Sequence, residues 1–306
     1  MKCHRKQIPQ SNSLVLLKLL VITKMRRQYS SLSSLNLNLA KYFLSSGMYF
    51  TSSISVRINV NMHSYLDNPA CSIFAHRGGS IETYENTIES FNYAVDLGCE
   101  YIETDVQLSS DGVPYIFHDD DLHRFIGKKL RFNDLNSDEL NQIKLFDRFS
   151  IPTLKECMEA FPNTKFNIDL KTNEVMKPAM KYLHSINAHS RVCIASFSDQ
   201  RLDFVKKNYP KFCRSMGPSE ILSLKLHSLG LKKFSPEADC VQIPIYKYGI
   251  KLATKKLIET AHRLNLKVHV WTINDAATMD KLIDLGVDGI ITDKPNLLKE
   301  RIATKK

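Results

Sequence analysis

Short β-rich runs alternate strictly with helical patterns from residue 72 onward, and this alternation limits the folds open to the chain. Eight runs are rich in the β-branched and aromatic residues that strands favour, and they span residues 72–75, 101–106, 166–170, 192–196, 212–216, 239–243, 267–272 and 289–292. Between the runs, apolar residues recur at helical spacing, most clearly in residues 85–97, 253–264 and 276–285. This order predicts an α/β fold, a (β/α)8 TIM-type barrel, with a doubly wound open sheet as the alternative.

Residues 109–151 interrupt the alternation. They follow the second strand and contain a short strand candidate at residues 114–117, a charged segment and little periodicity. We expect them to form an insertion over the mouth of the barrel. No internal repeat and no linker divides residues 71–300, which are therefore expected to form one barrel domain.

The net charge of +10 comes from the N-terminal tail. Residues 1–66 contain nine Lys and Arg residues and no Asp or Glu, whereas the rest of the chain contains 33 basic and 32 acidic side chains. Because the body is nearly neutral, we expect no nucleic-acid partner.

The tail is also rich in serine and leucine, a composition typical of a mitochondrial transit peptide. A disordered N-terminal extension is the alternative. The best apolar run, residues 14–22, is interrupted by Lys18 and is too short to cross a membrane, so no transmembrane segment is expected. We expect a cytoplasmic or mitochondrial protein; secretion is less favoured because no clear small-residue cleavage site follows the run.

The seven cysteines are scattered along the chain and form no C-x-x-C pair. Cys99, Cys193 and Cys240 lie in apolar segments, where cysteine behaves as a small buried hydrophobic residue. An odd number of cysteines without clustering favours a reducing compartment over a disulfide scaffold.

Four short groups of polar residues combine histidines, carboxylates and an arginine. They read His76-Arg77-Gly78-Gly79, Glu85-Asn86-Thr87, Glu103-Thr104-Asp105 and His118-Asp119. Three of the four lie within or directly after a short apolar run, so we expect them at strand ends. In a TIM-type barrel, the C-terminal ends of the strands carry the active site.

Glu103 and Asp105 lie two residues apart on a predicted strand, so their side chains point to the same side. Two inward carboxylates repel each other unless a cation neutralises them. A hard divalent ion such as Mg²⁺ or Ca²⁺ does so with oxygen ligands. A solvated strand face is the alternative for such a pair alone, but the flanking His-Arg-Gly-Gly and His-Asp groups favour a metal site.

His76 and His118 each end an apolar run, and two histidines can divide the proton transfers of a phosphoryl-transfer reaction. Arg77 supplies a forked donor that suits phosphate oxygens, and the two glycines after it let the backbone approach a ligand closely. No P-loop pattern is present, so no nucleotide signature accompanies the site. We interpret His123 as a surface residue.

From His76 through Arg124 the chain resembles the glycerophosphodiester phosphodiesterase family, with its HRG, ENT, E-x-D and HD-x-x-L-x-R elements. Later segments agree with the family at residues 167–171 (NIDLK), 195–197 (ASF), 270–274 (VWTIN) and 288–293 (DGIITD). The resemblance covers residues 71–298. It implies a phospholipase C-like phosphodiesterase barrel of TIM type, a divalent metal, and hydrolysis of a glycerophosphodiester to an alcohol and glycerol 3-phosphate.

The resemblance also implies a role for each matching residue. The acid/base pair would be His76 and His118. The substrate phosphate would be held by Arg77 and Lys171, and Trp271 would line the pocket for the glycerol or lipid moiety. The metal ligands would be Glu103, Asp105 and Asp169.

Two positions depart from the family pattern. Asp169 stands where glutamate is common, so its shorter side chain changes its reach towards the ion. Tyr84 stands where proline often precedes the ENT element, which leaves the loop geometry open. Glu85 could touch the metal or hold the loop, and Asn86-Thr87 is expected to cap the following helix.

The predicted function is metal-dependent hydrolysis of deacylated glycerophosphodiesters such as glycerophosphocholine, with water or the glycerol's own hydroxyl as nucleophile. Lysophospholipase D activity on lysophospholipids is an alternative, because the NIDLK form of the third motif also occurs in lipid-directed family members. An apolar open groove at the insertion would favour a lipid, and a closed polar lid would favour a soluble head group. The remaining alternative is a catalytically inactive barrel that binds phosphorylated ligands, although no required group is missing from the sequence.

Overall fold

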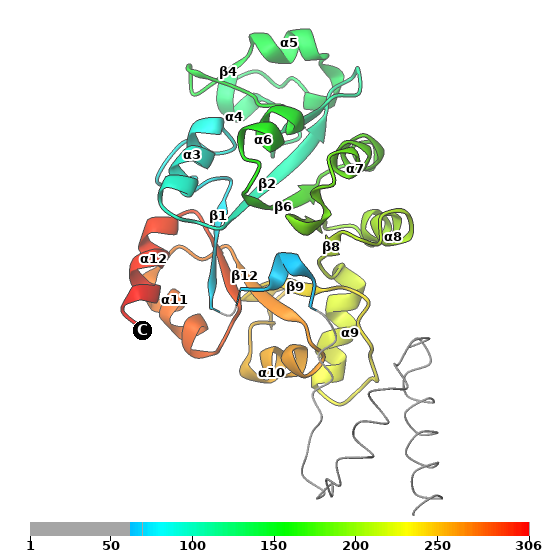
Figure 1. The fold of residues 1–306 in the computed structure, drawn as a ribbon, viewed down its shortest axis with the longest axis vertical. Helices are drawn as coiled ribbons and strands as arrows, with labels where there is room; N and C mark the ends of the chain where they lie inside the picture. Colours follow the sequence, from blue (N-terminus) through cyan, green and yellow to red (C-terminus); the bar gives the residue numbers. More distant parts are fainter. Residues whose placement is uncertain (1–61, 69, 306) are drawn as a thin grey trace, which may run out of the picture. The chain divides into compact units, whose positions relative to one another are not determined.

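The computed structural model describes residues 62–68 and 70–305, which all belong to one compact unit, Asn59–Lys306. Residues 1–61 lie outside this description, so the expected targeting or disordered segment falls almost entirely there. Figure 1 shows the described chain coloured along the sequence.

Eight parallel strands form a nearly closed barrel (Figure 1). They are β1 (Ser72–His76), β2 (Tyr101–Leu108), β6 (Lys165–Leu170), β7 (Val192–Ala195), β8 (Cys213–Arg214), β9 (Cys240–Pro244), β12 (Lys267–Trp271) and β13 (Gly289–Thr292). Their order is β8-β7-β6-β2-β1-β13-β12-β9, and an isolated bridge between Ser215 and Cys240 links the two ends. The predicted barrel is confirmed over the open-sheet alternative, and every predicted strand lies within two residues of its expected bounds.

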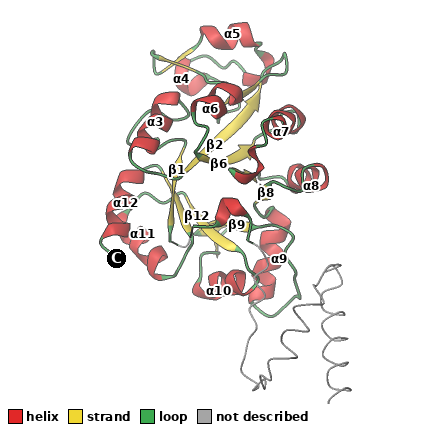
Figure 2. Ribbon diagram, viewed as in Figure 1, coloured by secondary structure: helices red, strands yellow, loops and turns green. Residues whose placement is uncertain are grey.

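Helices follow the strands and cover the outside of the barrel (Figure 2). They are α3 (Ile88–Asp96), α6 (Leu154–Ala160), α7 (Met176–Ser185), α8 (Asp199–Asn208), α9 (Pro218–Ser228), α10 (Lys255–Arg263), α11 (Ala276–Asp284) and α12 (Pro295–Ala303), with the short η3 (Ala188–Ser190) after α7. The three helices expected from periodicity correspond to α3, α10 and α11. Among the described residues, no helix combines the length and apolar character needed to span a membrane.

The start of α3 follows from local sequence. The Thr87 side chain accepts a hydrogen bond from the Ser90 backbone N–H, and the Ser90 side chain accepts one from the Thr87 N–H. This reciprocal capping box confirms the expected cap at Thr87. Gly98 follows the helix with φ of +85°, a left-handed conformation that ends helices and that glycine adopts without strain.

Alternation along the strands separates an outer core from an inner one. Outward side chains such as Ile102, Phe166 and Ile168 pack against the helices. The inner cluster contains the buried aromatic rings of Phe74 and Tyr101, whose centroids lie 4.4 Å apart in a stacked arrangement. These inner residues fill the N-terminal half of the barrel and leave its C-terminal half for polar groups.

A short helix closes the N-terminal end of the barrel. Tyr65 and Leu66 of η1 (Ser64–Leu66) are buried in the inner cluster. The Tyr101 hydroxyl donates a hydrogen bond to the Tyr65 carbonyl oxygen at 2.7 Å. The packed barrel therefore begins ahead of residue 71, where the sequence placed its start.

Residues 109–151 form a small lobe after β2. Its elements are β3 (Pro114–Ile116), α4 (His123–Ile126), η2 (Phe132–Asp134), α5 (Ser137–Gln142), β4 (Lys144–Leu145) and β5 (Phe149–Ser150). The lobe has its own apolar core around Tyr115 and Phe117, and it extends beyond the C-terminal end of β2 (Figure 1). His118 alone from this lobe lines the main cavity, so the insertion flanks the barrel mouth and does not cover it as expected.

Candidate active site

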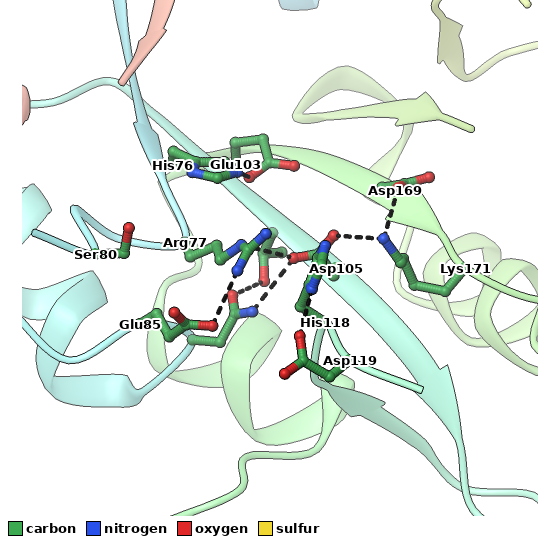
Figure 3. Close-up of polar contacts among 12 residues, drawn as sticks. His76, Arg77, Ser80, Glu85, Glu103, Asp105, His118, Asp119, Asp169 and Lys171 are labelled. Atoms are coloured by element: carbon green, nitrogen blue, oxygen red, sulfur yellow. Dashed lines mark hydrogen bonds and ion pairs between the residues drawn. The ribbon is translucent and has the colours of Figure 1, made fainter. Parts of the chain in front are cut away.

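One cavity of about 440 Å³ lies at the C-terminal ends of the barrel strands. It is lined by all eight residues for which the sequence predicted a role, namely His76, Arg77, Glu103, Asp105, His118, Asp169, Lys171 and Trp271. The polar members converge on one region in Figure 3. His118 comes from the loop after β3, and the others lie on strands or directly after them.

Strand register brings the acidic groups together. His76 on β1 lies opposite Glu103 on β2, and Asp105 on β2 lies opposite Asp169 on β6. Residues two apart on one strand share a face, so Glu103 and Asp105 both point inward. The three acidic residues are between 3% and 7% exposed, so little solvent screens their charges.

The buried carboxylates are not fully balanced by the side chains around them. Glu103 Oε2 and Asp169 Oδ1 have no hydrogen-bond partner. Burial, and then the nearby Asp105 carboxylate, raise the pKa of Glu103 to about 7 although His76 opposes the shift. Burial and Asp105 likewise raise the pKa of Asp169 to about 6 against the effect of Lys171. A cation among these oxygens would stabilise both carboxylates.

The donor set fits a hard divalent cation. Carboxylate oxygens are the ligands that Mg²⁺ and Ca²⁺ prefer, and Mg²⁺ commonly uses only one or two protein carboxylates with water and substrate oxygens. The oxygens of Glu103, Asp105 and Asp169 do not all lie within 4.8 Å of one another. Lys171 Nζ lies between two of them, 3.3 Å from Asp105 Oδ1 and 3.4 Å from Asp169 Oδ2. Lys171 therefore pairs with both Asp105 and Asp169, and Asp105 also faces Arg77, whereas Glu103 Oε2 and Asp169 Oδ1 stay without a partner.

The turn after β1 presents Arg77 to the cavity. Arg77 has φ of +52°, and Gly78 and Gly79 have φ of +86° and +105°. A Cβ atom at Gly78 would lie 2.3 Å from Ser90 Oγ on α3, so this position accommodates only glycine without movement. Arg77 Nη1 donates to Glu85 Oε1 at 3.0 Å, and its Nε lies 3.4 Å from Asp105 Oδ2.

His76 is oriented by a residue from the opposite end of the sequence. Its Nδ1 lies 2.5 Å from Asp293 Oδ1, and Asn274 Nδ2 donates to Asp293 Oδ2 at 2.6 Å. Ser80 Oγ donates to the same Asp293 oxygen as His76. The Nε2 atom of His76 faces Glu103 Oε2 at 3.7 Å. Burial alone would lower the pKa of His76, but Glu103 and Asp293 raise it above its ordinary value.

Asp293 has a role that the sequence did not reveal. It lies in the 288–293 motif, which matched the family without a function for any of its residues. Burial opposes ionisation of Asp293, but the hydrogen bonds from His76, Ser80 and Asn274 lower its pKa to about 2. It is therefore ionised at neutral pH and fixes the ring orientation of His76.

His118 is oriented by a second acid. Its Nδ1 lies 2.6 Å from Asp119 Oδ1, and Arg124 Nε donates to Asp119 Oδ2 at 2.7 Å. Arg124 also donates to both oxygens of Glu85, at 2.8 and 2.6 Å. Glu85 thus pairs with two arginines and does not line the cavity, which favours the loop-holding role over metal contact. Figure 3 shows Glu85 below Arg77 and joined to it.

The opposite wall of the cavity is apolar. Its side chains come from the end of β7, from α9, from the hairpin of β10 (Tyr246–Lys247) and β11 (Ile250–Lys251), and from β12. They are Phe197, Ile221, Leu222, Tyr248, Ile250 and Trp271, and Lys225 and Lys247 lie among them. The rings of Phe197 and Trp271 meet edge to face, with centroids 5.6 Å apart. An apolar surface therefore adjoins the charged groups, but it comes from this side of the barrel and not from the insertion.

Comparison with known proteins assigns the chain to a class. Residues 76–297 match the model of the glycerophosphoryl diester phosphodiesterase family, and the chain belongs to this family. It is accordingly an enzyme, a phosphoric diester hydrolase.

Individual relatives agree with this assignment. A probable glycerophosphodiester phosphodiesterase 2 of Mycobacterium tuberculosis is 34% identical over 233 residues, which cover 74% of this chain and 88% of that protein. The human lysophospholipase D GDPD1 is 28% identical over 267 residues, covering 74% and 84% respectively. An Oleispira antarctica phosphodiesterase, solved with the product sn-glycerol-3-phosphate, is 25% identical with a TM-score of 0.64, covering 76% of this chain and 97% of that one.

Proposed function

We propose that the enzyme hydrolyses glycerol phosphodiesters at the cavity with a divalent cation, by two-histidine acid/base catalysis. The observation that supports this most is the pair of unpartnered buried oxygens, Glu103 Oε2 and Asp169 Oδ1, in a cavity also lined by two histidines. Glu103 and Asp105 would hold Mg²⁺ or Ca²⁺, with Asp169 as a further ligand. When bound, the ion supplies Lewis-acid neutralisation of the charge that develops on phosphate oxygens.

Arg77 and Lys171 would bind the phosphate. Both are partly buried cations whose present partners include Asp105, at 3.4 Å from Arg77 Nε and 3.3 Å from Lys171 Nζ. They stand on either side of Asp105 in Figure 3, so a phosphate placed above that carboxylate meets a donor from each side. The forked guanidinium favours two oxygens and the ammonium favours one.

The two histidines would perform the proton transfers. Each has its Nδ1 beside a carboxylate, Asp293 for His76 and Asp119 for His118, so each directs Nε2 elsewhere. One imidazole removes a proton from the nucleophile, which is water or the free glycerol hydroxyl. The other donates a proton to the leaving oxygen as the phosphorus–oxygen bond breaks.

The apolar wall favours a second substrate class. Deacylated diesters such as glycerophosphocholine need only the polar half of the cavity, whereas a lysophospholipid would place its acyl chain along Phe197, Leu222 and Ile250. These three side chains are more than half exposed beside the cavity. Burying such apolar surface stabilises a bound chain by roughly 25 cal/mol per Å². The relative named lysophospholipase D is consistent with this class.

Activity on both substrates tests the proposal. The full chain is assayed for glycerol phosphate release from glycerophosphocholine and for choline release from lysophosphatidylcholine, with Mg²⁺, Ca²⁺ or EDTA. We expect metal-dependent turnover, and we expect His76→Ala to lose about 100-fold or more in kcat. His123→Ala is the matched control, because His123 is exposed and does not line the cavity.

The outcome separates the alternatives. Turnover of glycerophosphocholine alone would identify the soluble substrate class. Turnover of lysophosphatidylcholine, with a higher KM in Ile250→Ser for this substrate only, would identify the lipid class. Folded protein inactive on both substrates would contradict the proposal and favour a phosphate-binding barrel.

A further inference from the structure

Three cysteines from consecutive barrel strands meet in the barrel interior. Cys193 lies on β7, Cys213 on β8 and Cys240 on β9, and all three are completely buried. Their sulfur atoms all lie within 4.8 Å of one another, and the Sγ atoms of Cys193 and Cys240 are 3.8 Å apart. The cysteines of the described chain form no disulfide.

The positions of these cysteines follow from strand alternation. Each stands two residues before a residue that lines the catalytic cavity, because Ala195, Ser215 and Gln242 follow on the same strands or directly after them. Residues two apart share a face, so all three thiols point inward, one layer below the active site. Cys193 lies directly opposite Cys213 in the β7–β8 pairing.

Two buried polar side chains, Tyr65 and His269, lie in the same part of the barrel interior as the sulfurs. The hydroxyl of Tyr65 belongs to the same cluster, is fully buried and has no hydrogen-bond partner. An orphaned buried hydroxyl points to a missing neighbour. His269, 2% exposed, lies close to Cys240, and its Nδ1 lies 3.3 Å from Gln242 Nε2.

The sulfur geometry approaches that of a thiolate metal site. Zinc–sulfur bonds of about 2.3 Å in a tetrahedron place two sulfurs about 3.8 Å apart, which is the separation of Cys193 and Cys240. A disulfide between them would require approach to about 2.05 Å and would leave the third thiol unpaired.

We propose that Cys193, Cys213 and Cys240 bind a thiophilic metal ion such as Zn²⁺, with His269 close to Cys240. Binding converts the three thiols to thiolates and releases their protons to the solvent. Sulfur ligands select soft or borderline ions, whereas the oxygen ligands of the catalytic cavity select hard ones. The two sites are therefore chemically distinct, and this inference does not rest on the proposed function.

The fold suggests what such an ion would do. The hydrogen-bonded strand order ends at β8 and β9, and the isolated Ser215–Cys240 bridge connects these ends. Cys213 and Cys240 stand on the two sides of this seam. An ion shared by them would join the strands where backbone pairing is sparse. We therefore expect the ion to stabilise the folded protein.

Cobalt substitution of the full chain, prepared under reducing conditions, tests the site. Thiolate ligands give Co²⁺ an intense charge-transfer absorption, which oxygen ligands at the catalytic site do not. We expect one equivalent of Co²⁺ with this absorption in wild type, its displacement by Zn²⁺, and its loss in Cys240→Ser. Cys157→Ser is the matched control, because Cys157 is equally buried on α6 outside the cluster; it should retain the absorption.

Two further readouts keep the test decisive if Cys240→Ser folds poorly. Zinc content of wild type as purified should be close to one equivalent, and removal of the zinc should lower the Tm. His269→Ala keeps all three sulfurs but removes the polar side chain close to Cys240. It should weaken Co²⁺ binding about tenfold or more. Folded, reduced wild type without the thiolate–Co²⁺ absorption, or the same absorption in Cys240→Ser, would overturn the proposal.

Discussion

The imidazole of His76 on the first strand hydrogen-bonds the carboxylate of Asp293 directly after the last, with 2.5 Å between Nδ1 and Oδ1. β1 and β13 are neighbours in the barrel, so closure of the sheet creates this contact from residues more than 200 positions apart. The orientation of His76 therefore depends on the completed barrel and not on its own motif.

Replacing Asp293 tests this dependence. The Asp293 carboxylate fixes the His76 ring and raises the pKa of His76. Asp293→Asn removes this charge, so we expect kcat to fall by about 100-fold or more with little change in KM. The pH limb that reports His76 should move to lower pH, a shift that a purely structural defect would not produce. Asp203→Asn, at an exposed position on α8, is the control. Unchanged kcat in Asp293→Asn would contradict the positioning role.

Arg124 links Asp119, the partner of His118, to the loop that holds Arg77. Its guanidinium donates to both acids, Asp119 and Glu85, and lysine cannot reproduce that planar geometry. We expect Arg124→Lys to lower kcat about tenfold or more. The Arg124 side chain is 46% exposed, so the free energy of unfolding should change by less than about 1 kcal/mol. Arg148→Lys, exposed in the same lobe, should leave kcat unchanged.

Two glycines with nearly the same φ separate steric from conformational effects. Gly78 (φ +86°) would place a Cβ atom 2.3 Å from Ser90 Oγ, whereas Gly98 (φ +85°) has nothing within 4 Å. Gly98→Ala should lose about 1 kcal/mol of unfolding free energy through the left-handed conformation alone. Gly78→Ala should lose about 1–3 kcal/mol more, and activity, because α3 must move. Equal unfolding free energies of Gly78→Ala and Gly98→Ala, measured by denaturant titration, would contradict the steric effect at Gly78.

Metal-free protein should become less stable as pH rises. The folded-state pKa of Glu103 is raised to about 7 from its ordinary 4.5, so its contribution to stability is fully present below pH 4.5 and is lost towards pH 7. In chelator, we expect the unfolding free energy to fall by up to about 3 kcal/mol across this range. Mg²⁺ should restore it at pH 7. Glu103→Gln should remove only part of this pH dependence, because Asp169, whose pKa is also raised to about 6, contributes the rest. Exposed Glu259→Gln should keep the full dependence. A wild-type unfolding free energy that does not change between pH 4.5 and 7 would contradict the prediction.

Short-range patterns predicted the barrel and the inward pair Glu103 and Asp105, whereas the roles of Asp169, Lys171 and Trp271 came from the resemblance to the family. Alternating strands and helices define the barrel, and residues two apart on a strand define which carboxylates face inward. Contacts that form only when the barrel closes could not be predicted from such short-range patterns. Asp293 reaches His76 only across the β1–β13 pairing, and the three cysteines lie 20 to 47 positions apart on separate strands.

The insertion shows a different limit of sequence reasoning. Its position after β2 was correct, but residues 109–151 pack on a local core and contribute only His118 to the cavity. The apolar wall comes instead from α9 and the β10–β11 hairpin, where Leu222 and Tyr248 are exposed. Exposed apolar residues on a helix and a hairpin form no pattern that marks them as a cavity wall, because their meeting depends on tertiary packing.

The most direct test of the proposed catalytic site is the rate of glycerol phosphate release from glycerophosphocholine against free Mg²⁺ concentration, for wild type and Asp105→Asn. We expect saturable Mg²⁺ dependence in wild type, no activity in EDTA, and a loss of about 100-fold or more in Asp105→Asn that higher Mg²⁺ recovers only in part. Full wild-type activity in EDTA, or an Asp105→Asn variant with unchanged rate and Mg²⁺ dependence, would contradict a divalent cation held by Glu103 and Asp105.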